Sequence, residues 1–107
     1  MRRALAIFAG VVLLAAVGFV RHCSGPTPEL VSARMRGTVA EAVVRNAGRG
    51  EGLIQIDFRL RPKGGGPPLL HSEKATLRPG ETARIEARVD GARGDEQVEV
   101  ELDYPPR

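Results

Sequence analysis

The stretch QVEVELDY, residues 97–104, decides the fold class of this chain, because apolar and polar residues alternate along it without a break. Successive side chains of a β-strand point to opposite faces of its sheet. The stretch therefore predicts a strand with one apolar face, carrying Val98, Val100 and Leu102, and one acidic face. Such a strand belongs to an antiparallel sheet with one side in water, since strands of a parallel sheet are apolar on both sides.

The same period of two recurs in five earlier segments. They are residues 29–35, 39–44, 53–60, 69–76 and 82–89, and the pattern is weaker in 29–35 and 69–76 than in the others. Turns rich in glycine or proline separate these segments, and none of them has the spacing of an amphipathic helix. We therefore expect an all-β fold, an antiparallel β-sandwich of about six to seven strands over residues 29–105.

Two details of strand arrangement are also predicted. Residues 53–60 form the most apolar segment, which favours a central strand. Residues 82–89 and 97–104 are separated by a turn that contains Gly91 and Gly94, so they are expected to pair as an antiparallel hairpin. In that hairpin Arg84 would face acids of the last strand.

An uncharged stretch, ALAIFAGVVLLAAVGFV, covers residues 4–20, between Arg3 and Arg21. As a helix it would be about 25 Å long, slightly short of a hydrocarbon core of about 30 Å. A buried core helix is excluded, because a small β-domain could not cover a helix that is apolar all round. The sequence predicts export or membrane insertion. The membrane-spanning positions include Ala4, Ile7, Val11, Leu14 and Val20.

The fate of this segment has two readings. The favoured one is an uncleaved signal anchor, residues 1–22, joined to the domain by a Pro-rich hinge and spacer, residues 23–28. The alternative is a cleaved signal peptide, for which Ala16 and Gly18 supply small residues. A short basic amino terminus is typical of an export signal, so the domain is expected outside the cytoplasm, either on a single-pass anchor in the inner (plasma) membrane or as a periplasmic or secreted protein.

Cys23 is the only cysteine, which excludes an internal disulfide and a multi-cysteine metal site. It remains open whether it is an inert thiol, an intermolecular bridge or a lipidated cysteine. Arg21 and His22 disfavour lipidation, because small uncharged residues are required before a lipidated cysteine.

The charge distribution argues against nucleic acid as a partner. Two of the 16 basic residues precede the apolar stretch, which leaves 14 basic and 13 acidic residues from Arg21 onward. Arginines there alternate with acids, and aromatic stacking platforms are missing, so no stripe of one sign could neutralise several phosphates.

No motif fixes a chemistry, and we expect a chain without catalytic activity, cofactor or metal. His71 is the one histidine away from the membrane edge, and its neighbour Ser72 should point to the opposite face of a strand. The acids Glu99, Glu101 and Asp103 are two residues apart on one strand, and such ligands do not converge on one ion. They are expected to form a solvated face paired with arginines.

Two short motifs resemble turns of prokaryotic immunoglobulin-like and fibronectin-like modules, such as the CARDB type. Asn46 and Gly48 belong to a Val-x-Asn-x-Gly turn, and Pro79 and Gly80 to a Leu-x-Pro-Gly-Glu corner. Pro79 fixes φ and Gly80 tolerates positive φ, which suits a tight corner. The resemblance implies an immunoglobulin-like sandwich, and such domains commonly serve as adhesion, spacer or assembly modules in cell envelopes.

These observations predict a membrane-anchored, non-catalytic envelope module that binds or spaces a partner protein. The contact is expected through exposed edge strands or through the Gly-Pro loop of residues 63–68. An unpaired strand edge is an available route, since it offers a row of backbone donors and acceptors. The candidate partner edge consists of Leu69, Leu70, His71, Ser72 and Glu73. The alternative is a secreted module that binds a carbohydrate or a small ligand.

Overall fold

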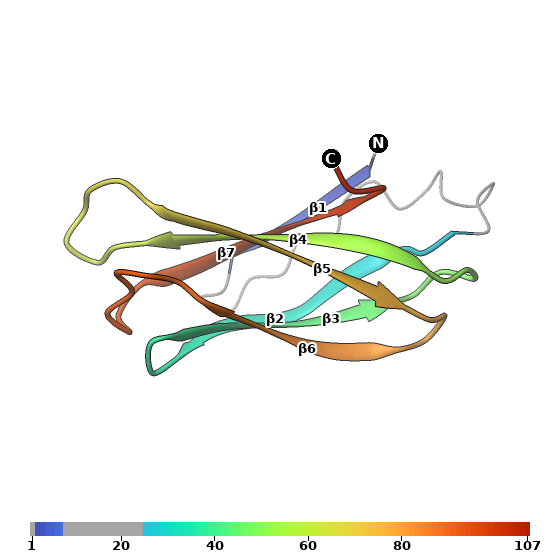
Figure 1. Cartoon of the computed structure of the whole chain (residues 1–107), viewed down its shortest axis with the longest axis horizontal. Helices are drawn as coiled ribbons and strands as arrows, with labels where there is room; N and C mark the ends of the chain where they lie inside the picture. The colour runs from blue at the N-terminus through green and yellow to red at the C-terminus, as the bar shows by residue number, and fades with distance from the viewer. Residues whose placement is uncertain (1, 8–24) are drawn as a thin grey trace.

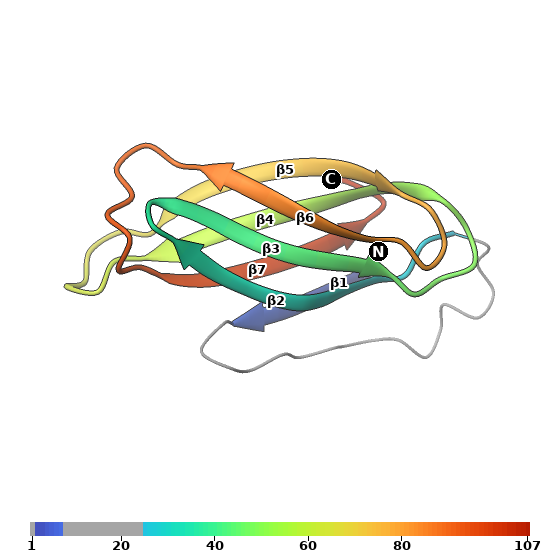
Figure 2. The ribbon, with the colours of Figure 1, turned by 90° about the horizontal axis from the view of Figure 1, so that it is seen from below.

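The chain folds as two antiparallel sheets that face each other, as Figures 1 and 2 show. The computed structural model describes residues 2–7 and 25–107. The strands are β1 (Arg2–Ile7), β2 (Pro28–Arg36), β3 (Val39–Asn46), β4 (Gly52–Arg61), β5 (Leu69–Leu77), β6 (Thr82–Arg88) and β7 (Gln97–Tyr104). One sheet has the order β1-β7-β4-β5 and the other the order β2-β3-β6. The prediction of an all-β fold is confirmed for the described residues.

The helix expected of the amino-terminal segment is not shown in the described residues. Ala4 and Ile7 lie in β1, which is extended and pairs with β7, because an apolar stretch can complete a sheet as well as enter a membrane. Val11, Leu14 and Val20 lie outside the described residues. Within the described residues, no helix has the length and apolar character that crossing a membrane requires.

The core lies between the inner faces of the two sheets, as the period of two predicts. Ile54, Ile56, Phe58 and Leu60 of β4 are buried, and β4 is an interior strand, flanked by β7 and β5. Burying each such large apolar side chain contributes about 1.5–3 kcal/mol. The opposing layer uses smaller residues, including Ala40, Ala42 and Val44 of β3.

The predicted hairpin between the last two strands is wrong. β6 pairs with β3 in one sheet, and β7 pairs with β4 and β1 in the other. The chain between them crosses from sheet to sheet, and there Glu96 accepts the N–H groups of Arg93 at 2.6 Å and Gly94 at 2.8 Å. Alternation could not reveal this, because both strands turn their apolar faces to the same core whether they pair or face each other.

Asn46 ties together one end of the sandwich. Its buried side chain accepts N–H groups from Thr27 at 3.0 Å and Gly48 at 2.8 Å, and donates to the carbonyls of Gly50 at 2.8 Å and Leu77 at 3.1 Å. Its backbone carbonyl accepts the N–H of Gly80 at 2.7 Å. The two motifs that carry the family resemblance, which lie in different parts of the sequence, therefore meet at one point.

Gly80 has the positive φ, 79°, that the corner motif predicts. The corner joins β5 of one sheet to β6 of the other, with Pro79 exposed beside it. At its start Leu77 is buried, 2% exposed, and plugs the end of the core.

The residues predicted as a hinge and spacer are packed against the domain from Gly25 onward. We call residues 25–27 the strap. Thr27 accepts the N–H of Ala47 at 2.8 Å, and Pro26 is buried. A Cβ at Gly48 would lie 2.6 Å from the carbonyl oxygen of Gly25, so only glycine allows this approach. The strap is therefore held against the sandwich by backbone contacts.

Candidate functional site

One side of the sandwich is open. In the part of the chain that the structure describes, β5 pairs with β4 alone and β6 pairs with β3 alone. These two edge strands run along the same side of the molecule, where they are seen in front in Figure 1. We call the gap between Leu69–Leu77 and Thr82–Arg88 the β5–β6 seam.

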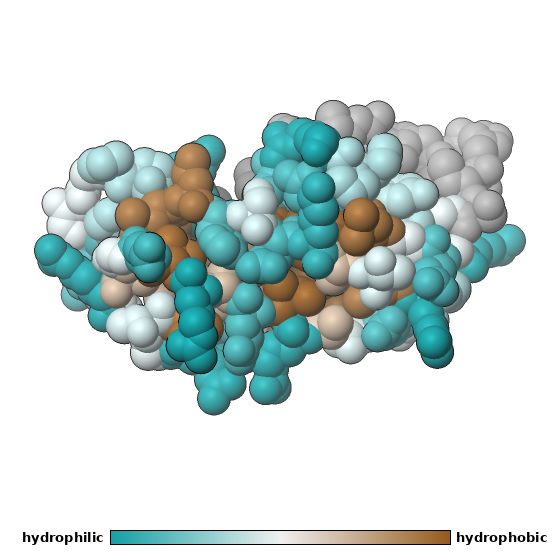
Figure 3. All heavy atoms as spheres, viewed as in Figure 1, coloured by the Kyte–Doolittle hydropathy of each residue, from teal (hydrophilic) through white to brown (hydrophobic). Residues whose placement is uncertain are grey.

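Apolar side chains line this seam without being fully covered. Leu69, Ala75, Ala83 and Ile85 pack against the core but are only partly buried. Figure 3 shows apolar atoms between polar ones over this side of the molecule. On the outer face of β5, Leu70 is 67% exposed, against 50% for Val31 and 42% for Leu53, the other exposed large apolar residues described. A strand edge bordered by apolar surface favours contact with another protein.

His71 and Ser72 have different partners on opposite faces of β5, as strand geometry predicts. The Nε2 atom of His71 lies 2.6 Å from Oε2 of Glu73, and its ring packs at a tilt against Phe58, with centroids 6.4 Å apart. The hydroxyl of Ser72 donates to Asp57. The imidazole is therefore not positioned to activate the neighbouring serine, and the candidate partner edge carries a histidine–carboxylate pair facing the seam.

The outer face of the four-stranded sheet holds an open groove of about 600 Å³. Most of the residues that line it are charged or polar, among them Asp57, Arg59, Ser72 and Arg107, together with the apolar Phe58 and Leu70. Across it Arg61 donates from Nε to Oε2 of Glu99 at 2.5 Å. The acids of β7 are thus paired with arginines, as the sequence predicts, although the arginines come from β4 and the C-terminal residues rather than from β6. The expected solvation of this acidic face is wrong for Asp103, which is 0% exposed.

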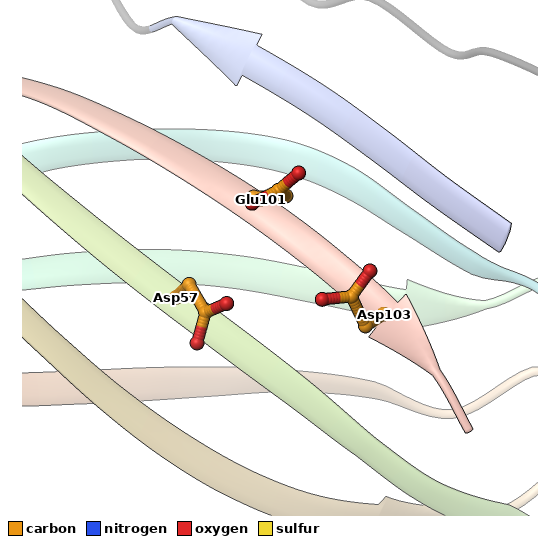
Figure 4. A group of neighbouring side chains, drawn as sticks. All are labelled: Asp57, Glu101 and Asp103. Atoms are coloured by element: carbon orange, nitrogen blue, oxygen red, sulfur yellow. The ribbon is translucent and has the colours of Figure 1, made fainter. Parts of the chain in front are cut away.

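Three carboxylates lie close together on β4 and β7, as Figure 4 shows, and two of them, Asp57 and Glu101, also line this groove. Oxygens of Asp57, Glu101 and Asp103 all lie within 4.8 Å of one another. The argument that acids of one strand do not converge on an ion missed Asp57, which reaches the group from β4 because its Cα pairs with Glu101 and β4 lies beside β7. Pairing between strands distant in sequence left no signal in the local pattern.

Arg107 lies in the middle of these carboxylates. Its Nε is 2.9 Å from Oδ2 of Asp103, and its Nη2 bonds Asp57 and lies 4.0 Å from Oε1 of Glu101. Burial alone would raise the pKa of Asp57, but hydrogen bonds from Ser72 and Gln55 and the charge of Arg107 outweigh it and hold that pKa below its ordinary value. A divalent cation would have to displace the guanidinium of Arg107, which already contacts all three carboxylates.

A second charged cluster lies on the outer face of the three-stranded sheet. Glu41 is 3% exposed, and its carboxylate forms ion pairs with three arginines: Arg34 at 3.2 Å, Arg36 at 3.3 Å and Arg84 at 3.1 Å. Burial would raise the pKa of Glu41, but the hydrogen bonds and positive charge of these arginines lower it overall. Sequence reasoning missed this cluster, because Arg84 was assigned to a partner on β7 and no local pattern joins β2, β3 and β6.

Comparison with known proteins adds no relative to this description. No family model, no curated protein and no solved structure matches the chain.

Proposed function

We propose that this chain is a non-catalytic interaction module of a cell envelope, held at a membrane by residues 4–20 with its sandwich outside the cytoplasm, and that it binds or spaces a partner protein along β5 and the β5–β6 seam. The observation that carries the proposal is the open side of the sandwich. There an unpaired strand edge, the exposed Leu70 and a partly covered apolar strip lie together.

The immunoglobulin-like assignment is part of the same proposal. A sheet of order β2-β3-β6 facing a sheet of order β7-β4-β5 supports it, since immunoglobulin-like sandwiches place strands A-B-E against strands F-C-C′. In that assignment β5 is the C′ strand at the end of its sheet. Fold alone carries no function, so the argument for a partner rests on the exposed surface of β5.

The membrane part rests on the 17 uncharged residues between Arg3 and Arg21. The packed strap supports a spacer role, because it leaves only Arg21, His22, Cys23 and Ser24 between that stretch and the domain. Four extended residues reach about 14 Å. A module held this closely would keep its strap end near the lipid and direct its other end, with the loop of residues 62–68, away from it.

Site-specific photo-crosslinking tests the partner surface. A benzoylphenylalanine replaces Leu70 in the full-length chain, and in a matched control it replaces Thr38, an exposed residue in the turn between β2 and β3. We expect illumination of intact cells to give a discrete adduct of higher mass from position 70 and none from position 38. The same adducts from both positions, or none from position 70, would refute β5 as the contact surface.

The polar groove favours a second candidate function, a secreted module that binds a carbohydrate or small ligand after signal cleavage. Groove residues Arg59, Ser72 and Glu101 offer donors and acceptors to such a ligand. Intact mass of the mature chain separates the two functions. A chain that begins at Phe19 supports secretion, and a chain that retains its amino terminus supports the anchor.

A further inference from the structure

β7 has a strand on each side, and one of these strands comes from the start of the chain. Its inner neighbour is β4, and its outer neighbour is β1. The register with β1 is antiparallel and unbroken from Arg2 opposite Tyr104 to Ile7 opposite Glu99. Figures 1 and 2 show β1 alongside β7 in both views. In the immunoglobulin-like assignment this place beside strand F belongs to strand G.

The same residues cannot occupy this place and a membrane at once. Residues 4–7 belong to the uncharged stretch that the proposed function puts in the lipid. When that stretch is inserted, the outer edge of β7 loses its neighbour. Backbone N–H and C=O groups that pointed at β1 then need another partner or water.

We propose that the outer edge of β7 is a strand-docking site for an extended segment of a partner protein, that this segment combines basic and small apolar residues, and that Arg2–Ile7 occupies the site in this structure. The proposal rests on the proposed function, because the site becomes free when residues 4–20 are inserted in a membrane.

The chemistry of the partner follows from β7 and from its present occupant. The outward residues of β7, Glu99, Glu101 and Asp103, are acidic, and Arg3 of the occupant lies at the register position of Asp103. An antiparallel pair with a second copy of β7 is disfavoured, because it would place this acidic row against itself, and like charges across strands are destabilising. A basic and apolar strand avoids this repulsion.

Residue-resolved amide hydrogen exchange tests the site in the full-length chain in lipid nanodiscs. With the edge free, we expect alternate amides of Gln97–Tyr104, those directed away from β4, to exchange at least 10-fold faster than their neighbours. A synthetic peptide with the sequence RRALAI should restore their protection, and the charge-reversed peptide EEALAI should not. Uniform protection of β7 without peptide, or no response to RRALAI, would overturn the proposal. Protection that rises with protein concentration would also overturn it, because it would identify a second copy as the occupant.

Two further measurements distinguish failure of the docking site from failure of the proposed membrane location. Spin-labelled lipids in the same nanodiscs should broaden the signals of residues 4–20 if these residues are inserted, and absence of broadening would refute the membrane location alone. In lipid-free detergent the variant Ala6→Pro removes a backbone donor of β1 and weakens its pairing. RRALAI should then protect β7 of the Ala6→Pro chain more than that of an Ala6→Ser control. Equal effects in the two variants would refute the docking site independently of any membrane.

Discussion

At the scale of single residues, Asn46 joins three segments through one buried amide. Asn46→Ala leaves the N–H groups of Thr27 and Gly48 and the carbonyls of Gly50 and Leu77 without their partner. Each buried unsatisfied group costs about 1–3 kcal/mol, and some of them will reach water. We expect Asn46→Ala to lower the free energy of unfolding by about 3 kcal/mol, measured by urea denaturation.

The control for this variant is Gln97→Ala, which removes an exposed amide and should change stability by less than about 0.5 kcal/mol. Asn46→Asp keeps the two accepted bonds but places a carboxylate against two carbonyls, so it should destabilise as much as the alanine variant. Two variants as stable as the wild type would show that Asn46 does not hold this end together.

The contribution of Glu41 to the free energy of unfolding depends on pH. Because its arginines lower its pKa below the ordinary 4.5, its contribution to stability is present above that pH and is lost as the pH falls through the folded-state pKa. The arginines are more than half exposed, so Glu41→Gln should cost about 1–2 kcal/mol at pH 7. The difference from the wild type should shrink as the pH falls below 4.5, in urea unfolding curves. A difference that stays constant down to pH 3 would contradict this role.

At the scale of elements, the strap depends on two close backbone approaches. A Cβ at Gly48 would lie 2.6 Å from backbone atoms of the strap, whereas a Cβ at Gly64, in the loop after β4, meets nothing within 4 Å. Gly48→Ala should therefore lower the free energy of unfolding by about 2 kcal/mol through overpacking. The matched variant Gly64→Ala should leave it unchanged or raise it slightly. Thermal unfolding followed by circular dichroism measures both, and equal midpoints would show that the strap is not packed as described.

The strands also show how much of the fold can be predicted from the sequence. Alternation predicts the six strands β2–β7 to within two residues at each end, and high apolar content predicts that β4 is interior. Both features can be read from each segment alone. Which strands pair is not a local property. The sequence predicts a hairpin between β6 and β7, because the glycines there are compatible both with a hairpin turn and with a crossing from one sheet to the other. It predicts a hinge in place of the packed strap, because the packing of the strap depends on Asn46 and Gly48 of another segment.

At the scale of the whole molecule, three carboxylates make the fold sensitive to acid. Glu41, Asp57 and Glu96 all have pKa values held below their ordinary values, in each case against the opposing effect of burial. For Glu96 the opposing causes are backbone N–H groups of Arg93 and Gly94. Their contributions are present above about pH 5 and disappear as the pH falls through the folded-state values.

The urea midpoint should accordingly fall steadily between pH 5 and pH 3. The triple variant Glu41→Gln, Asp57→Asn, Glu96→Gln should show a smaller fall than the wild type. Parallel pH profiles for the two chains would contradict this account, because the slope reports the protons taken up on unfolding.

The candidate site is visible in the sequence only in part. Leu69–Leu77 carries the predicted edge residues, and the weak alternation of that segment already distinguished it from the strongly apolar β4. The groove, the carboxylate group around Arg107 and the arginines of Glu41 depend on contacts between residues 4 to 50 positions apart. Such contacts follow from sheet order, which the alternation of single strands does not contain.

The central claim, a folded sandwich on the outer side of a membrane anchor, is tested most directly by cysteine labelling in intact cells. In a Cys23→Ser background, Thr38→Cys adds a thiol at an exposed turn, and Ala42→Cys adds one at a position with 0% exposure as the control. We predict that a membrane-impermeant maleimide labels only the Thr38→Cys chain, and that the labelled chain stays in the membrane pellet after an alkaline wash. Labelling of Thr38→Cys only after the cells are opened, equal labelling of both variants, or a labelled chain in the supernatant would contradict the claim.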